Sequence, residues 1–329
     1  MKEFLNHIYI QTGLIIIAIM GLLGDYIEYN LIYAIAIVVA FIAIGLAWLN
    51  IRKERKFYIQ ENIPIPLVIR VDSNKSPEHI FDNLVQDIEK KYSLSDLEQN
   101  LKKYLNIVRE ELIFEYTGDI YNKSSLISFI QIISYQLNKL QQNAKGRIKF
   151  HLAYYQRPSV GFLIGQIFEL DGLVIYQKNP DSDHFDEVAT VKDRNYKTIV
   201  STFTKFKVSE QILDTFDNTV LVTIKASSHD IALHASSLKP YKNIITLHAN
   251  HSGTITLDED WILYAREIFT VLNKLQKKYK NITIAHAMPE SIAILVGMAI
   301  SNYLPIQMTQ YEKGEYVHFI KLNEVKCYF

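Results

Sequence analysis

Two long apolar stretches open the chain. No charged side chain occurs over residues 8–24 or over residues 29–51. At about 1.5 Å of rise per helical residue, these stretches would span roughly 25 and 35 Å, against a bilayer core of about 30 Å. The pattern predicts a transmembrane hairpin over residues 1–51, with spans at about 8–24 and 31–51, and a cytosolic linker over 52–65. Buried core helices and a cleaved signal peptide are the two alternatives.

The charges beside the two stretches predict their orientation. The connection over residues 25–28 carries two acidic side chains and no basic one, whereas four basic side chains lie within residues 52–56. Because basic residues near the ends of a span stay in the cytoplasm, both termini are expected there. Small residues recur along the second stretch with a spacing that allows close contact between helices, at Ala36, Ala40, Ala43 and Ala47.

Beyond residue 65, short apolar runs alternate with segments of helical spacing, which is the pattern of an α/β domain with parallel sheets. The predicted strands cover residues 66–71, 112–116, 147–154, 173–177, 220–226, 243–247, 282–287, 306–310 and 316–322. The predicted helices cover residues 77–91, 94–109, 124–142, 258–278 and 289–303, and two more begin at Pro158 and near Asp230. Thr256 and Glu259 have the spacing of a capping box for the long helix at 258–278.

The α/β part is predicted to be a duplication. It extends over residues 66–329 and divides into halves of about 66–190 and 200–329. The run Leu-Asn-Lys-Leu-Gln occurs at 137–141 and again at 272–276. A helix start with serine and glycine six residues apart, next to a proline, also occurs twice, at 159–165 and 291–297.

Composition narrows the class of protein. Hydrophobic residues make up 49% of the chain and 35 basic side chains balance 35 acidic ones, which argues against a disordered protein and a basic nucleic-acid coat. The single cysteine, Cys327, excludes a disulfide framework and cysteine-ligated zinc. Common phosphate-loop, dinucleotide, nucleophile-elbow and zinc-protease motifs are absent. Two histidine pairs lack an evident third ligand. No catalytic residue, cofactor or metal is therefore expected, and the protein is not expected to be an enzyme.

Candidate binding residues gather where the predicted strands end, because open α/β sheets bind ligands beyond the carboxyl ends of their strands. Cations there suit phosphates, helix starts present N–H groups to an anion, and the rings of Tyr154, Tyr155 and Tyr176 can stack on bases. The candidate ligand-binding residues are Asp72, Ser73, Lys75, Tyr154, Arg157, Ser159, Lys225, Ser227, Ser228, His229 and Ser291. This combination favours a small anionic ligand that contains bases.

Two runs resemble the SAVED domain: Leu-Val-Thr-Ile-Lys-Ala-Ser-Ser-His-Asp-Ile at 221–231, and Ile-Thr-Ile-Ala-His-Ala-Met-Pro-Glu-Ser-Ile-Ala-Ile-Leu-Val-Gly at 282–297, followed by Pro305 and Gln310-Tyr311. The likeness is good over about 200–322 and loose in the first half. It implies two fused CARF-like Rossmann-type halves that sense a cyclic oligonucleotide, as in the CBASS anti-phage systems and some type III CRISPR systems. A cyclic tri- or tetranucleotide between the halves is implied, with the trinucleotide as the expected ligand, and so is ligand-driven oligomerisation.

The hairpin and the resemblance together predict an effector of anti-phage defence in the bacterial inner membrane. Ligand binding would make the chain self-associate, and the clustered hairpins would disrupt the bilayer and cause growth arrest or cell death. The expected partners are the second messenger, the lipid bilayer and further copies of the chain, with no long nucleic acid. A membrane-anchored CARF-type ring nuclease that degrades the signal, and a passive membrane scaffold, are the alternatives.

Overall fold

The structure is a computed structural model that describes residues 15, 35, 37–49, 52, 62–72, 76–144, 148–168, 172–179, 182, 184–233, 235–251, 253–300 and 306–325. The chain divides into two compact units, Met1–Ile63 and Pro64–Phe329. Two candidate binding residues, Ser73 and Lys75, lie outside the described residues, as does most of both predicted spans.

In the first unit, residues 37–49 are helical and lie within the second predicted span. Most large apolar side chains of this helix are exposed, whereas Ala40 and Ala43 are half-buried and Ala47 is fully buried. Among the described residues, no helix combines the length and the apolar character needed to cross a membrane. The hairpin stays a prediction.

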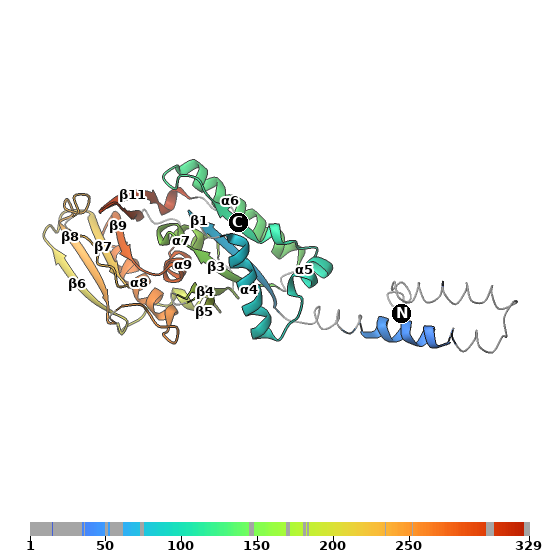
Figure 1. Cartoon of the computed structure of the whole chain (residues 1–329). Helices are drawn as coiled ribbons and strands as arrows, with labels where there is room; N and C mark the ends of the chain where they lie inside the picture. Colours follow the sequence, from blue (N-terminus) through green and yellow to red (C-terminus); the bar gives the residue numbers. More distant parts are fainter. Residues whose placement is uncertain are drawn as a thin grey trace. The chain divides into compact units, whose positions relative to one another are not determined.

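The first sheet of the second unit lies in the first half of the sequence (Figure 1). Its strand order is β2-β1-β3-β4-β5, and its strands are β1 (Ile63–Val71), β2 (Ile113–Tyr116), β3 (Ile148–Tyr155), β4 (Val174–Lys178) and β5 (Phe185–Thr190). β2 is parallel to β1, β4 is parallel to β3, and β5 is antiparallel to β4. Every residue of β1 is buried, as expected for a strand covered on both faces.

The second sheet repeats this topology. Its order is β11-β10-β9-β7-β8-β6, and its strands are β6 (Phe206–Ile212), β7 (Thr219–Lys225), β8 (Asn243–Ala249), β9 (Asn281–Ala287), β10 (Ile306–Glu312) and β11 (Glu315–Lys321). The order β8-β7-β9-β10-β11 matches β2-β1-β3-β4-β5 strand for strand, and β11 is antiparallel to β10 just as β5 is to β4. The predicted duplication is confirmed, with β6 added beside β8.

The helices follow the same repeat. They are α4 (Pro77–Tyr92), α5 (Leu97–Leu105), α6 (Lys123–Asn143), α7 (Pro158–Gln166), α8 (Trp261–Leu275) and α9 (Glu290–Ala299), with short 3₁₀ turns η1 (Arg109–Glu111), η2 (Asn195–Lys197) and η3 (Leu322–Glu324). α6 and α8 precede β3 and β9, and α7 and α9 follow them. The start of α4 shows why the sequence predicted it well, because the hydroxyl of Ser76 accepts from the His79 N–H and Pro77 occupies the first turn.

The two halves are joined where α7 crosses α9. A Cβ atom added to Gly165 would lie 2.8 Å from the backbone nitrogen of Met298 and closer still to the carbonyl oxygen of Ile294. A Cβ atom added to Gly297 would lie 2.8 Å from the carbonyl carbon of Phe162. Gly165 thus faces Ile294, three residues before Gly297, and Gly297 faces Phe162, three residues before Gly165. Only glycine permits backbones to approach this closely, so the Ser…Gly repeat seen in the sequence encodes this joint.

The helix predicted from near Asp230 is wrong. The described residues 230–233 and 235–241 are irregular or form turns, although several of their apolar side chains still pack into the core against Leu221 and Tyr316. The carboxylate of Glu315 accepts the N–H groups of Ser236 and Ser237, at 3.2 and 3.4 Å. These N–H groups therefore bond to a strand of the sheet instead of to carbonyls one turn earlier, which explains why helical spacing did not produce a helix.

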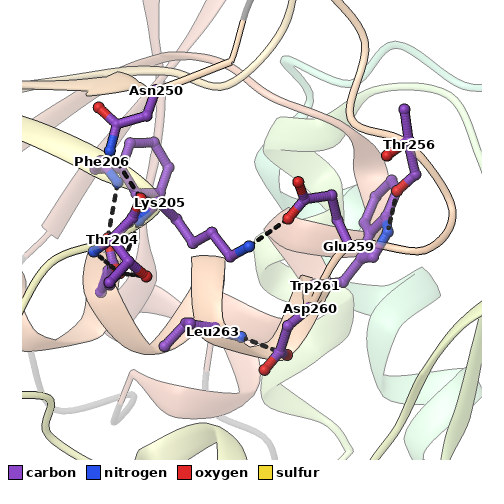
Figure 2. Close-up of polar contacts among 10 residues, drawn as sticks. Thr204, Lys205, Phe206, Asn250, Thr256, Glu259, Asp260, Trp261 and Leu263 are labelled. Atoms are coloured by element: carbon purple, nitrogen blue, oxygen red, sulfur yellow. Dashed lines mark hydrogen bonds and ion pairs between the residues drawn. The ribbon is translucent and has the colours of Figure 1, made fainter.

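The capping box predicted from Thr256 and Glu259 is also wrong. α8 begins at Trp261, and the side chain of Asp260 accepts an N–H of the first turn at 3.0 Å. Figure 2 shows what the two residues do instead: the carbonyl of Thr256 accepts from the indole of Trp261 at 3.1 Å, and Glu259 forms an ion pair with Lys205. Both contacts hold the chain in turns ahead of the helix.

A buried carboxylate fixes the segment that leads into β6. Glu267, which is fully buried on α8, accepts the N–H groups of Thr204, Lys205 and Phe206 at 2.6, 3.0 and 2.8 Å. The three N–H donors replace the hydrogen bonds to water that this carboxylate loses when it is buried. The connection between the halves is therefore anchored on the second sheet's own helix.

Candidate junction site between the two halves

A hollow of about 550 Å³ lies at the carboxyl ends of β4, β7 and β9, where the two halves meet. Its volume is in the range of small-molecule sites. The first half contributes Gln177, Lys178 and Asn179, and the second half contributes Ser227, His229, Thr254, Ile255, Thr256, Leu257, Trp261, Met288, Pro289 and Glu290. A ligand bound here would contact both halves at once.

Gln177 connects the halves at this hollow. Its amide nitrogen donates to the carboxylate of Glu290 at 2.9 Å, and its amide oxygen accepts from the backbone N–H of Ser291 at 3.2 Å. The start of α9 is therefore capped by a side chain of the other half. The N–H group that the sequence suggested for an anion already has a partner.

The hydroxyls of Ser159 and Ser291 join the halves rather than line the hollow. Both residues are 1% exposed. Ser159 donates to the carbonyl of Thr309 on β10 at 2.9 Å, and Ser291 donates to the carbonyl of Tyr176 on β4 at 3.3 Å. Each serine thus bonds to a strand of the opposite half, so the two hydrogen bonds follow the same duplication as the strands and helices.

Ser159 and His286 have the distance of a nucleophile and its base, 2.9 Å from Oγ to Nε2. The serine has one proton, and that proton goes to the carbonyl of Thr309, which can only accept. His286 must therefore donate from Nε2, and burial lowers its pKa to about 4. A histidine that donates to serine does not take the serine's proton, so this pair is not an activated nucleophile.

Three candidates of the first half come together at the ends of β1 and β3. The Nε of Arg157 donates to Asp72 at 3.1 Å, and the hydroxyl of Tyr154 donates to the carbonyl of Arg157 at 2.8 Å. Asp72, Gln156 and Arg157 have φ angles of 49°, 70° and 58°. Left-handed conformations in residues other than glycine are strained, and such strain gathers at ligand clamps and switches. The ion pair ties two strained turns to each other.

The candidates of the second half lie at the end of β7. Ser227 and His229 line the hollow, and the hydroxyl of Ser227 accepts from the backbone N–H of His229 at 3.3 Å. Ser228 is exposed and does not line the hollow. Lys225 ends the strand and forms an ion pair with Asp230.

Both candidate cations that the structure describes, Arg157 and Lys225, carry an acidic partner that is the more exposed member of the pair. The side chain of Asp230 is 83% exposed against 24% for Lys225, and that of Asp72 is 50% exposed against 29% for Arg157. A phosphate that reaches either cation must replace a carboxylate. The carboxylates lie toward solvent, so replacement leaves them hydrated at little cost.

Sequence reasoning missed part of the hollow. Burial of the ring of Tyr176, whose hydroxyl lies 2.9 Å from Nδ1 of His151, leaves no face for a base, and Tyr154 is also buried. Gln177 and Lys178 end a correctly predicted strand and Asn179 follows it, so the strand-end rule could have found them. The loop over 254–257 carries no such signal. Among the residues that the structure describes, no cluster of side chains could hold a metal ion.

Comparison with protein families identifies the second half. Residues 191–322 match the SAVED family. The family is described as the SMODS-associated and fused to various effectors sensor domain. The match covers β6 to β11 and the residues that the second half contributes to the hollow. The SAVED resemblance inferred from the two runs is thereby confirmed for this part of the chain.

Solved structures of Cap4 SAVED/CARF-domain containing receptors are similar to the chain. Two from Acinetobacter baumannii, with the cyclic trinucleotides 3'3'3'-cAAA and 2'3'3'-cAAA, are 15% identical, with 89% of this chain and 60% of theirs covered and a TM-score of 0.49. One from Moraxella osloensis is 15% identical, with 62% and 43% covered and a TM-score of 0.42. This chain spans less than two thirds of these receptors' length. No curated protein sequence matches it.

Proposed function

We propose that the chain is a membrane-anchored sensor of a cyclic oligonucleotide, with a cyclic trinucleotide as its ligand, in an anti-phage system of the CBASS type. The observation that carries the proposal is the hollow lined by both halves, most of whose lining lies within the SAVED-matching region. Its amide and hydroxyl groups can bond to base edges, and Lys225 and Arg157 at nearby strand ends can bind phosphates.

The membrane part of the proposal is supported by the helix at 37–49. Its large apolar side chains are exposed on most sides, which a bilayer would cover and water would not. The guanidinium of Arg52 lies 5.2 Å from the ring of Trp48, and a tryptophan with an adjacent cation is typical of the membrane–water boundary. The proposed arrangement is a two-span hairpin in the bacterial inner membrane with both termini in the cytoplasm.

Ligand binding and membrane damage are connected by self-association. A ligand that contacts both halves shifts the chain toward the conformation that binds it better. If that conformation exposes a surface for further copies, the hairpins are brought together and their effective concentration rises. Ala40, Ala43 and Ala47, which are covered within one chain, favour close helix packing in each hairpin, and the exposed apolar side chains of the same helix are available for contacts between hairpins. The clustered hairpins disrupt the membrane, and the chain performs no catalytic step.

The proposal is tested with the full chain in dye-filled vesicles. Cyclic trinucleotide should release dye, linear trinucleotide should not, and the cyclic ligand should be recovered intact. Cleaved ligand would indicate a ring nuclease, and binding without leakage would indicate a scaffold. A Gln177→Ala variant should bind the ligand at least about 10-fold more weakly, because its amide connects the halves at the hollow. Gln211→Ala, an exposed position on β6, is the matched control.

A further inference from the structure

A second hollow, of about 350 Å³, lies at the opposite edge of the second sheet, where β7 and β9 begin. Its lining includes three exposed lysines, Lys277, Lys278 and Lys280. Tyr279 also lines it, and the Tyr279 hydroxyl is buried with no hydrogen-bond partner among the described residues. Ammonium groups and a spare hydroxyl donor fit an anionic group rich in acceptor oxygens, such as a phosphate.

Beside this hollow, the loop over residues 213–218 holds two apolar side chains in solvent. Phe216 is 93% exposed and Leu213 is 69% exposed. The loop is nevertheless well bonded: the fully buried side chain of Asn243 donates to the carbonyl of Asp214 at 2.7 Å, and Asp214 accepts from the Phe216 N–H at 3.0 Å. The loop backbone is therefore held in place while its two large apolar side chains stand in solvent.

Backbone hydrogen bonds connect the loop of Leu213 and Phe216 to two lysine positions. The carbonyl of Asn218, which lines the hollow, accepts from the Lys280 N–H at 2.9 Å. On the other side of the loop, the Leu213 N–H donates to the carbonyl of Lys242, whose ammonium group bonds to Asp214 at 3.1 Å. Lys242 and Lys280 therefore adjoin the two ends of the loop, while Asp214 and Asp217 lie within it on either side of Phe216. Four lysines against two carboxylates leave this region with a net positive charge.

We propose that this face docks onto an anionic bilayer, with a lipid phosphate in the lysine-lined hollow and Phe216 and Leu213 in the interfacial region. Cations beside an exposed aromatic ring are the composition of membrane-surface segments. A bilayer fits better than a protein partner, because the apolar part consists of two side chains on one loop in a region of net positive charge, and not of a broad apolar face. The inference goes beyond the proposed function, since this edge of the sheet is opposite the junction hollow.

The test uses the full chain with Cys327→Ser and a single new cysteine, Thr215→Cys, that carries an environment-sensitive dye. In vesicles with one third phosphatidylglycerol, the dye emission should rise several-fold and shift to the blue, and high salt should reverse the change. In phosphatidylcholine vesicles it should not change. The dye on Tyr135→Cys, an exposed position on α6, is the control and should stay unchanged in both.

Charge reversal supplies the second arm. Changing Lys277, Lys278 and Lys280 to glutamate should abolish the signal, whereas changing the exposed Lys192, Lys313 and Lys321 to glutamate should retain it. An equal signal in neutral vesicles, equal competition by inorganic phosphate, or a signal that depends only on protein concentration would overturn the proposal, the last by indicating a second copy. Retention of the chain on neutral vesicles reports the hairpin separately.

Discussion

At the crossing of α7 and α9, Gly165 should matter far more for stability than Gly161 on the same helix. A Cβ atom on Gly165 would lie 2.8 Å from the nitrogen of Met298, whereas one on Gly161 would lie 3.3 Å from the ring of Tyr154 and 3.4 Å from the Cβ of Ala293. Ordinary contacts begin at 3.4 Å. Gly165→Ala must therefore push the two backbones apart, whereas Gly161→Ala asks only for a small shift of side chains.

The expected difference in the free energy of unfolding follows from these distances. Overpacking of a tight core costs about 1–3 kcal/mol. If the helices move apart by about 1 Å, each atom pair at the crossing also loses up to half of its dispersion energy. Alanine in place of helical glycine contributes about 1 kcal/mol in both variants. Gly161→Ala should therefore be neutral or slightly stabilising. Because the alanine contribution is common to both variants, the free energy of unfolding of Gly161→Ala should exceed that of Gly165→Ala by the overpacking cost, at least about 1–3 kcal/mol. Gly297→Ala should behave like Gly165→Ala.

The assay follows Trp261 fluorescence during urea unfolding of the full chain in a Trp48→Phe background. Trp261 is 2% exposed and belongs to the second unit, so its emission reports loss of that unit's core. Equal midpoints and equal slopes for Gly161→Ala and Gly165→Ala would refute the argument that the helix crossing limits the approach of the halves.

Three further predictions follow from the described contacts. Arg157→Glu and Lys225→Glu should each weaken cyclic-trinucleotide binding at least about 10-fold in titration calorimetry, and Asp72→Asn, which removes the competing carboxylate, should strengthen it several-fold. Glu267→Gln should lower the free energy of unfolding by about 2 kcal/mol, because a neutral amide replaces a buried acceptor of three N–H groups. Burial lowers the pKa of His286 to about 4, below its unfolded value of about 6.5, so the unfolded chain takes up the proton first. Stability should fall by about 2 kcal/mol between pH 7 and 5 and level off below pH 4, and His286→Asn should remove this component.

The sequence predicted strands that are buried on both faces better than strands at the edges. β1 is apolar along its length and buried throughout, so its pattern is clear. β5 and β6 were missed. Both are antiparallel edge strands without a clear apolar run, because half of the residues of β5 and four of the seven residues of β6 are polar. The missing helix after Asp230 has a different cause: the acceptor for its N–H groups, Glu315, lies far away in the sequence. Long-range acceptors of this kind leave no local pattern.

The candidate site was predictable to the extent that it depends on strand ends. Ser227 and His229 line a hollow at the end of β7, and the apolar run of this strand showed in the sequence where it ends. Their role in ligand binding stays a prediction. The roles of Ser159 and Ser291 could not be predicted in this way. Both positions look like free helix starts in the sequence, and only the crossing of α7 and α9 brings each hydroxyl to a strand of the other half.

The duplication also bears on which ring the proposed site prefers. The second half contributes to the hollow through Glu290, which bonds to Gln177. The counterpart at the end of β10 contains Glu312, which bonds to Tyr121, and the nearby strained turns carry the Asp72–Arg157 pair. The two ends are thus related by topology but differ in chemistry. A cyclic oligonucleotide with a two-fold axis has the same chemical group at opposite positions of its ring, and would present that group to two unlike ends. A trinucleotide ring has no two-fold axis, so a nucleoside lies opposite a phosphate and the two ends meet different groups. If the full chain binds cyclic di- or tetranucleotides as tightly as cyclic trinucleotides, the difference between the ends does not select the ligand.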